Sequence, residues 1–209
     1  SPFFRRGSRE LTSIDDAVVL IGNVELRRLT LTTIMSDQFQ IKSSYFQRFG
    51  SKIWAHSFDV AVMAEKYAAE RSANAFKAYF NGLIHDVGRL VIFRILIKVL
   101  QSLGADKQPS TGFLSSIIHQ YGYHLTLSAI HAWDLDQELV KPILLYKSMQ
   151  EMEEMDVETQ GLFYANTVSE YMFLKQSGHV TDECLNEFLH SNGIDDQLLK
   201  ELLAGLTEK

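Results

Sequence analysis

The chain has 209 residues, with 20 Lys and Arg against 26 Asp and Glu, so its formal net charge is −6 when His is neutral. The composition of 46% hydrophobic and 22% charged residues, with 12 Gly and only 3 Pro, excludes a mainly disordered, collagen-like or low-complexity chain and predicts a packed globular protein. The basic residues are scattered, apart from a small cluster at Arg5, Arg6 and Arg9. Because binding to a phosphate backbone relies on clustered positive charge, we expect no nucleic-acid partner.

Cysteine content and hydropathy predict a cytoplasmic protein without a membrane segment. The single cysteine, Cys184, cannot form an internal disulfide, which argues against a disulfide-stapled secreted fold, and we expect it to fill the core. The longest apolar run, residues 90–100, is interrupted by Arg94 and Lys98 and is shorter than the roughly 20 residues that cross a bilayer. Residues 1–7 lack the apolar stretch of a secretory signal.

Apolar residues recur at three- and four-residue spacing over most of the chain, which predicts an all-α protein. The predicted helices run from Ser13 to near Gly22, from Asn23 toward a break at Gly50-Ser51, and over residues 53–71, 73–86, 90–103, 113–120, 124–133, 136–148, 156–176, 181–191 and 195–206. A loop is predicted over residues 104–112, and glycines at 122 and 178 are predicted to separate helices. With no repeat and no long linker, the pattern predicts one helical domain.

The strongest local signal is an adjacent His85-Asp86 pair at the end of a predicted helix, between Gly82 and Gly88. Imidazole nitrogen and carboxylate oxygen are both ligands for divalent transition metals. Consecutive residues on a helix point about 100° apart, so the two side chains converge on one ion only at a helix end or a local kink. A hydrogen-bonded structural pair is the alternative interpretation, and the dipeptide alone does not separate the two.

A second histidine, His56, lies on a predicted helix 29 residues before His85. His56 followed by the segment Gly-Leu-Ile-His-Asp-Val-Gly resembles the HD superfamily of metal-dependent phosphohydrolases. The resemblance is closest to its HDOD branch, the HD-related output domain of bacterial signalling proteins. It extends over residues 1–4 and 13–31, over Tyr123-His124, and over Trp133-Asp134-Leu135-Asp136, although Ser128 and Asp136 replace the usual Gly and Pro.

The resemblance covers essentially the whole chain. It implies an all-α, multi-helix HD-superfamily-like bundle in which residues 1–209 form a single HDOD-like domain. Because HDOD domains usually have several helices before the position of Ser1, it also implies that an N-terminal portion of the family pattern is missing from this chain.

Site residues carry over from the family one position at a time. His56, His85, Asp86 and His124 match positions that bind metal in catalytic relatives. Tyr146-Lys147 stands where relatives with two metals have paired histidines, and Asn166 stands where the superfamily has a distal aspartate.

This set of side chains supplies too little negative charge for a two-metal centre. Two divalent ions bring four positive charges, and Asp86 alone supplies a carboxylate to hold them. The resemblance therefore implies a degenerate site that holds at most one weakly bound divalent ion, and we expect no cofactor.

The other histidines and the tryptophans have structural interpretations. His119, His131, His179 and His190 match no family position and are expected at the surface or at helix caps. Trp54 and Trp133 are expected to anchor helix packing in the core.

Two functions from different classes follow from the resemblance. In the first, the chain is a non-catalytic regulatory or output domain of bacterial signal transduction, which acts through a regulatory protein partner. In the second, it is a metal-dependent phosphohydrolase acting on a nucleotide or phosphodiester through His56, His85, Asp86 and His124. A nucleotide-binding domain without chemistry is a third interpretation. The missing distal aspartate and paired histidines favour the first, and all three predict that His56, His85, Asp86 and Asn166 meet around one cleft.

Overall fold

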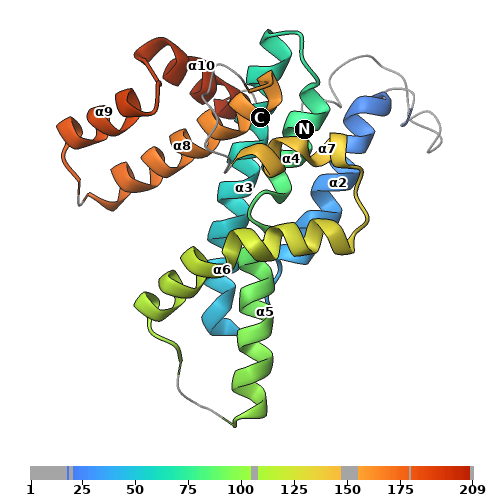
Figure 1. The fold of residues 1–209 in the computed structure, drawn as a ribbon, viewed down its shortest axis with the longest axis vertical. Coiled ribbons are helices and arrows are strands. Elements are labelled where there is room, and N and C mark those ends of the chain that lie inside the picture. The colour runs from blue at the N-terminus through green and yellow to red at the C-terminus, as the bar shows by residue number, and fades with distance from the viewer. Residues whose placement is uncertain (1–17, 19–20, 105–107, 147–154, 179, 208–209) are drawn as a thin grey trace, which may run out of the picture. The chain divides into compact units, whose positions relative to one another are not determined.

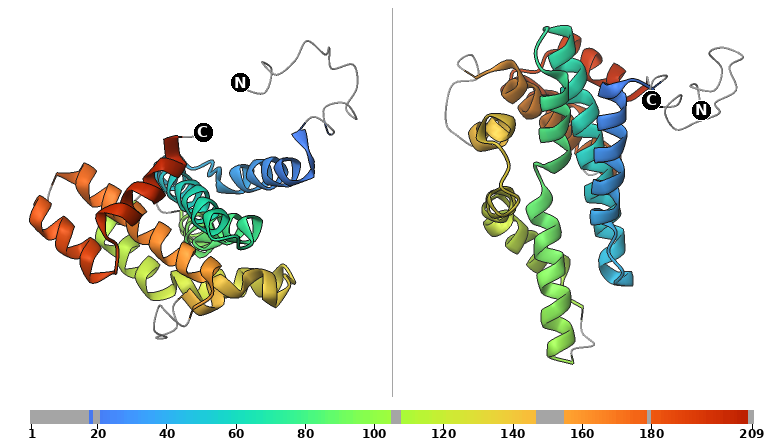
Figure 2. Two further views of the ribbon diagram at one scale, coloured as in Figure 1. Left: turned by 90° about the horizontal axis from the view of Figure 1, so that it is seen from above. Right: turned by 90° about the vertical axis from the view of Figure 1, so that its right-hand side faces the viewer.

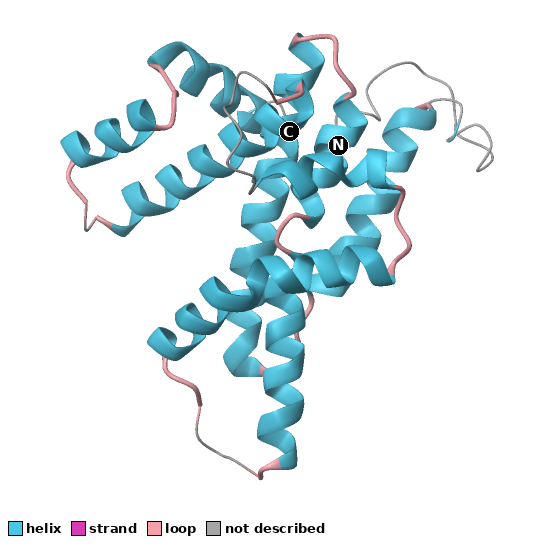
Figure 3. Cartoon of the chain, in the orientation of Figure 1, coloured by secondary structure: helices cyan, strands magenta, loops and turns pink. Residues whose placement is uncertain are grey.

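The computed structural model describes residues 18, 21–104, 108–146, 155–178 and 180–207. These residues form helices and connecting loops and contain no strand (Figure 3), so the predicted all-α class is confirmed. The chain divides into two units, Ser1–Gln38 and Phe39–Lys209, which are described separately here. None of the described helices is both long and apolar enough to cross a membrane.

The first unit contributes most of helix α2, Asn23–Phe39. It begins directly after Gly22, whose φ of +81° lies in the left-handed region that favours glycine. In its first turns Arg28 donates a hydrogen bond to Glu25, with 2.7 Å between Nη2 and Oε1. The helix predicted from Ser13 lies outside the described residues, apart from the helical residues 18 and 21.

The second unit contains the remaining helices in chain order: α3 (Ser44–Glu70), α4 (Ala75–Ile84), α5 (Val87–Ser102), α6 (Thr111–Ala132), α7 (Gln137–Tyr146), α8 (Val157–Ser177), α9 (Asp182–Ser191) and α10 (Asp196–Thr207). Side-chain caps explain several of the starts, because Asn74, Ser110, Asp156 and Thr181 each accept a hydrogen bond from a backbone N–H in the first turn. Gly178 ends α8 in the left-handed conformation.

Helix α3 is the centre of this unit. It packs against α4, α8 and α10, and α3 and α8 lie side by side in Figures 1 and 2. Val60, Ala61, Met63 and Ala64 are fully buried on it. The small side chains allow close helix contacts, while residues such as Tyr79, Leu162 and Leu202 fill the space between helices. Helices α5 and α6 also pack against each other.

Two predicted helix breaks are wrong. Helix α3 continues through Gly50, where an added Cβ would lie 3.0 Å from the carbonyl oxygen of Phe39. Residues 113–120 and 124–133 form the single helix α6, in which Gly122 is buried and its carbonyl lies against α5. Gly50 serves close packing inside a helix, and at Gly122 it is the backbone carbonyl that lies against Gly88. Neither case can be distinguished from a chain break in the sequence pattern.

Two predicted core residues are also wrong. Cys184 is exposed, because Leu185 and Leu189 form the buried face of α9 and the side chain before Leu185 points about 100° away from it. Trp133 follows the last residue of α6 and is 45% exposed. Trp54 does pack against aromatic rings, with its centroid 5.3 Å from that of Phe39.

Candidate functional site

Three side chains from two places in the chain converge in the second unit. His56 lies in the middle of α3, whereas His85 and Asp86 form the two-residue connection between α4 and α5. Nε2 of His56 lies 3.3 Å from Oδ2 of Asp86, and Nε2 of His85 lies 3.5 Å from the same oxygen. One ligand atom from each residue falls within 4.8 Å of the others. The structure therefore brings these three residues together, as the resemblance implies, and their role as metal ligands stays a prediction.

Two glycines fix the connection that carries the His-Asp pair. A Cβ added at Gly82 would lie 2.5 Å from Cα of Ala61, so the backbones of α4 and α3 touch there. A Cβ added at Gly88 would lie 2.0 Å from the carbonyl oxygen of Gly122, so α5 approaches α6 equally closely. Because neither approach tolerates a side chain, the segment between the glycines is held from both ends.

Thr126 ties the connection to α6 by hydrogen bonds. Its hydroxyl oxygen accepts the N–H of Gly88 at 3.0 Å, and lies 3.2 Å from the carbonyl oxygen of His85 and 3.1 Å from that of Gly122. The residue is 1% exposed. A buried hydroxyl that satisfies a backbone donor in this way fixes the position of the backbone next to Asp86.

The His85 ring is buried and held in one orientation. Its Nδ1–H donates to the carbonyl oxygen of Gly82 at 2.7 Å, which leaves Nε2 as the lone-pair nitrogen of the neutral ring. Burial lowers the pKa of His85 to about 4, although the charge of Asp86 acts in the opposite direction. At neutral pH the Nε2 lone pair therefore faces the Asp86 carboxylate.

Asp86 stands at the N-cap of α5, but its side chain makes no cap hydrogen bond and turns toward the two histidines. Burial on its own would raise the pKa of this carboxyl, but His85, Arg89 and His56 outweigh it and hold the pKa well below the usual value. Nη1 of Arg89 lies 3.0 Å from Oδ2 of Asp86. Asp86 is therefore a carboxylate with a guanidinium already beside it.

Asn166, on α8, lies beside His85. Its Oδ1 is 3.3 Å from Nε2 of His85, and its Nδ2 donates to the Tyr146 hydroxyl at 2.8 Å and to Glu170 at 3.2 Å. Burial, together with the nearby Asp86 and Glu170, raises the pKa of Tyr146. Tyr146 and Asn166, which both stand where the family pattern has metal ligands, therefore contact each other. Lys147 lies outside the described residues.

Sequence reasoning missed three residues of the site. Ser169 lies with its hydroxyl 2.7 Å from Nδ1 of His56, Glu170 accepts from Asn166, and Arg89 pairs with Asp86. Ser169 and Glu170 follow Asn166 by three and four residues, and Arg89 follows Asp86 by three. Helical spacing places such residues on the face of the residue they follow, so this spacing could have identified them.

The structure does not place His124, the fourth ligand position carried over from the family, with His56, His85 and Asp86. His124 is exposed on α6, and its side chain is absent from the cluster that His56, His85 and Asp86 form among the described residues. The other histidines predicted at the surface are exposed where the structure describes them: His119, His131 and His190. His179 lies outside the described residues.

The atoms at the centre of the group fit a single cation. Nε2 of His85 and Oδ2 of Asp86 both present lone pairs, and Nε2 of His56 and Oδ2 of Asp86 are buried without a hydrogen bond of good geometry. Two ligands of one ion, each about 2.1 Å from it, lie roughly 3.0 to 3.4 Å apart, close to the distances of 3.3 and 3.5 Å found here. His56, His85 and Asp86 are therefore the residues that would hold one divalent ion.

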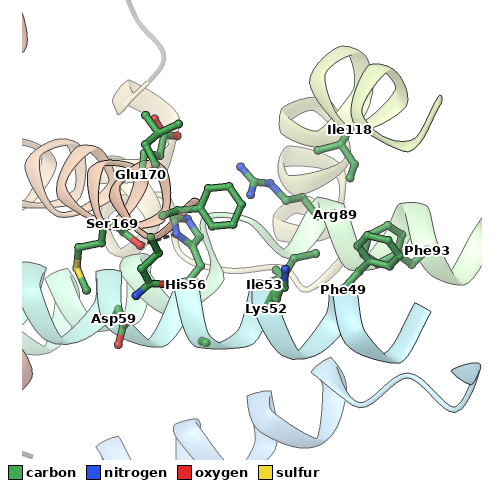
Figure 4. A pocket seen from close by; sticks show the side chains of 15 residues that line it. Phe49, Lys52, Ile53, His56, Asp59, Arg89, Phe93, Ile118, Ser169 and Glu170 are labelled. Carbon is green, nitrogen blue, oxygen red and sulfur yellow. Dashed lines mark hydrogen bonds between the residues drawn. The ribbon is translucent and has the colours of Figure 1, made fainter. Parts of the chain in front are cut away.

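A cavity of about 560 Å³ lies beside the group (Figure 4). Four of the residues above line it, namely His56, Arg89, Ser169 and Glu170. Apolar side chains form much of the remaining wall, among them Phe49, Ile53 and Phe93. The volume falls within the range of pockets for small molecules, so a ligand or an ion can reach the polar group from this side.

Comparisons with solved structures agree with the fold. A Shewanella amazonensis SB2B protein provisionally described as a metal-dependent phosphohydrolase has a TM-score of 0.64 and 14% identity, covering 98% of this chain and 76% of its own. A second protein from the same organism, provisionally described as a phosphohydrolase, has a TM-score of 0.60 and 20% identity, covering 93% and 73%. At this identity the likeness concerns the fold.

Sequence comparison identifies the family. Ribonuclease Y of Fusobacterium nucleatum is 30% identical over 84 residues, which are 39% of this chain and 16% of the length of that protein. The HDOD domain family matches residues 1–149, a segment that contains His56, His85 and Asp86. This match spans well over half of the sequence, so the chain belongs to the HDOD domain family of the HD superfamily.

Proposed function

We propose that this HDOD domain is a non-catalytic regulatory module of bacterial signal transduction, in which the His-Asp group is kept as a buried polar framework. The observation that carries the proposal is Asn166, a neutral amide that lies 3.3 Å from His85 where catalytic members of the superfamily have a carboxylate. In the cluster of metal-ligating side chains among the described residues, Asp86 is the only anion.

The charge balance supports a non-catalytic role. A divalent ion bound by His56, His85 and Asp86 would supply Lewis acidity toward a phosphoester. Holding that ion in a buried site requires anionic ligands to offset its loss of water. Here Asp86 is the one carboxylate of the cluster among the described residues, so a single ion would be held weakly and a second would lack a bridging carboxylate.

In this proposal the domain acts in the cytoplasm through a regulatory protein partner, without binding nucleic acid or a membrane surface. A formal charge of −6 with scattered basic residues supports the exclusion of nucleic acid. The cavity beside His56 leaves room for a small effector, for which a nucleotide is one candidate class.

A phosphohydrolase is the second candidate, and the convergence of His56, His85 and Asp86 within 4.8 Å favours it. The names of ribonuclease Y and of the two Shewanella proteins point to phosphoester hydrolysis. In this reading the substrate would be a nucleotide or another phosphodiester that enters the cavity.

A turnover assay separates the two candidates. Protein purified without chelator is loaded with manganese, nickel, iron(II) or zinc and offered a generic phosphodiester, cyclic dinucleotides and a single-stranded RNA oligonucleotide. Asp86→Ala provides the background. We expect equal rates from the parent and the variant, whereas metal-dependent turnover that disappears in Asp86→Ala would overturn the regulatory proposal.

Asn166→Asp tests the observation on which the proposal depends. The substitution restores a carboxylate beside His85, so we expect measurable metal binding where the parent shows little. A paired Asn166→Asp and Glu170→Gln variant removes the like-charge contact that the new carboxylate would make with Glu170. If neither variant gains metal affinity over the parent, the amide at position 166 is not what weakens the site.

A further inference from the structure

The His56 ring has a close neighbour at each of its two nitrogens, and the two contacts differ in quality. Nδ1 lies 2.7 Å from Oγ of Ser169 on α8, well within hydrogen-bond distance. Nε2 lies 3.3 Å from Oδ2 of Asp86, and both of these atoms are buried without a well-formed hydrogen bond to any described residue. The contact that can hold the ring is therefore the one from α8.

These two contacts indicate which nitrogen of His56 carries the proton of the neutral ring. A neutral imidazole has one N–H, on either Nδ1 or Nε2. A proton on Nε2 would be a buried donor without a well-aligned acceptor among the described residues. A proton on Nδ1 is donated to the Ser169 hydroxyl oxygen. Because buried polar groups in folded proteins are almost always paired, the geometry favours the proton on Nδ1.

We propose that Ser169 is a positioning residue of this site, whose hydroxyl oxygen accepts the Nδ1–H of His56 and thereby directs the Nε2 lone pair toward Asp86. His85 already has this arrangement, since its own Nδ1–H donates to the carbonyl oxygen of Gly82. Both rings then present Nε2 to one carboxylate oxygen, the orientation in which a neutral histidine can bind a cation. The proposal concerns the His56 ring and is independent of whether the domain hydrolyses a phosphoester.

The place of Ser169 on α8 suits this role. Its residue surface is 7% exposed, so its hydroxyl is largely shielded from competing water. It follows Asn166 by three residues, which puts both on one face of the helix, and Oδ1 of Asn166 lies 3.3 Å from Nε2 of His85. One face of α8 therefore contacts both histidine rings. Figure 4 shows Ser169 and His56 together at the wall of the cavity that both residues line.

The position of the ring proton is measured by nitrogen-15 NMR of the metal-free protein at about pH 8, where an ordinary histidine is neutral. The protonated and unprotonated nitrogens of a neutral ring have clearly separate shifts, and comparison with His56→Gln assigns the signals. We expect the proton of His56 on Nδ1 in the parent. In Ser169→Ala this nitrogen loses its acceptor, so the two shifts should move toward each other as both tautomers become populated.

Two other variants separate the hydroxyl from the rest of the helix. Ser169→Thr keeps the hydroxyl and should restore the shifts of the parent. Thr167→Val is the matched control, because it removes a hydroxyl that is equally buried on α8 but donates to the carbonyl of Phe163 in the same helix. It should leave the His56 ring unchanged.

Metal affinity gives a second measurement, by calorimetry with cobalt(II) in the parent and in Asn166→Asp. Adding Ser169→Ala to either protein should weaken cobalt(II) binding about 10- to 100-fold, the usual effect of removing the group that orients a ligating histidine. Thr167→Val should leave the affinity unchanged.

A His56 proton on Nε2 in the parent would overturn the positioning role, and so would folded Ser169→Ala protein with unchanged nitrogen shifts. Equal effects of Ser169→Ala and Thr167→Val would also contradict it, because they would assign the change to α8 as a whole. The tautomer measurement requires no metal, so it decides the matter even where binding is too weak to measure. Turnover by the parent would overturn the regulatory function and leave this contact untouched.

Discussion

Thr126 shows how a single hydroxyl away from the candidate ligands positions them. It satisfies the N–H of Gly88 and contacts the carbonyl of His85 from a different helix. Thr126→Val keeps the shape but leaves the Gly88 N–H without a partner in a buried environment. We expect a loss of about 1–3 kcal/mol in the free energy of unfolding.

Urea denaturation of the parent and two variants measures this loss. Thr126→Ser keeps the hydroxyl and removes one methyl group, so its loss should be clearly smaller than that of Thr126→Val. A larger loss in Thr126→Ser than in Thr126→Val would mean that the methyl group, and not the hydroxyl, matters at this position.

Asp156 contributes stability that depends on pH. Its side chain accepts the N–H of Thr159 at the start of α8 and lies 3.3 Å from Nζ of Lys141 on α7. Burial would raise the pKa of this carboxyl, but the hydrogen bonds from Thr159 and the ion pair with Lys141 lower it below the unfolded value of 3.8. The ionised form thus stabilises the folded state above the unfolded pKa, and this stabilisation disappears as the pH falls through the folded pKa.

The comparison of the parent with Asp156→Asn isolates this charge, because the amide oxygen can still accept the N–H of Thr159. The difference in the free energy of unfolding should be constant above about pH 5 and shrink below about pH 4. Asp156→Ala also removes the cap acceptor and should cost about 1 kcal/mol more. A difference that grows toward low pH would contradict the assigned direction of the pKa shift.

At the scale of helices, the contact between α3 and α4 depends on a position without a side chain. An added Cβ at Gly82 would overlap Cα and N of Ala61, which are backbone atoms and cannot move aside alone. Gly82→Ala should therefore push α4 away from α3 and cost about 3 kcal/mol or more in the free energy of unfolding.

Gly112→Ala is the matched control for this substitution. Gly112 lies in the first turn of α6, and an added Cβ there meets no atom within 4 Å. It should leave stability unchanged or raise it by less than about 1 kcal/mol. Thermal unfolding of both variants gives the comparison, and a mild effect at Gly82 would show that the helices can separate without loss of packing.

Helix positions could be predicted from the sequence because the spacing of apolar residues and the caps agree. Asp156 and Thr181 mark starts, and Gly178 marks an end, close to where the structure has them. Gly50 and Gly122 could not be interpreted correctly, since a glycine inside a helix and one that ends a helix look alike until the packing around them is known.

Only the residues of the candidate site that match the family pattern could be predicted from the sequence. That pattern led to His56, His85 and Asp86, and it marked positions 146 and 166 as departures before their contact was known. Thr126 could not be foreseen, because its partners lie 38 and 41 residues away and the packing of α5 on α6 creates the contact.

For the whole chain, the segment after residue 149 completes both the core and the site, although the family match ends there. Helix α8 supplies the buried Leu162 and Val168 as well as Asn166 and Ser169. A protein that ends at residue 149 should therefore expose the face of α3 that α8 covers and lose fixed side-chain packing.

Near-UV circular dichroism and dye binding of two truncated chains test this expectation. The chain ending at residue 149 should lose its near-UV signal and bind a hydrophobic dye. The chain ending at residue 180 keeps α8 and should retain a cooperative transition at lower temperature, because it lacks only α9 and α10. Cooperative unfolding of the shorter chain would show that the family-matched segment folds by itself.

The two close contacts at Gly82 and Gly88 have a consequence for genome annotation. Natural selection acting on helix packing alone would preserve the short segment between them, together with the histidine whose ring donates to the Gly82 carbonyl. A lineage that has lost catalysis can therefore keep the His-Asp signature for a very long time. Counting that signature alone can therefore overestimate the enzymes in a genome.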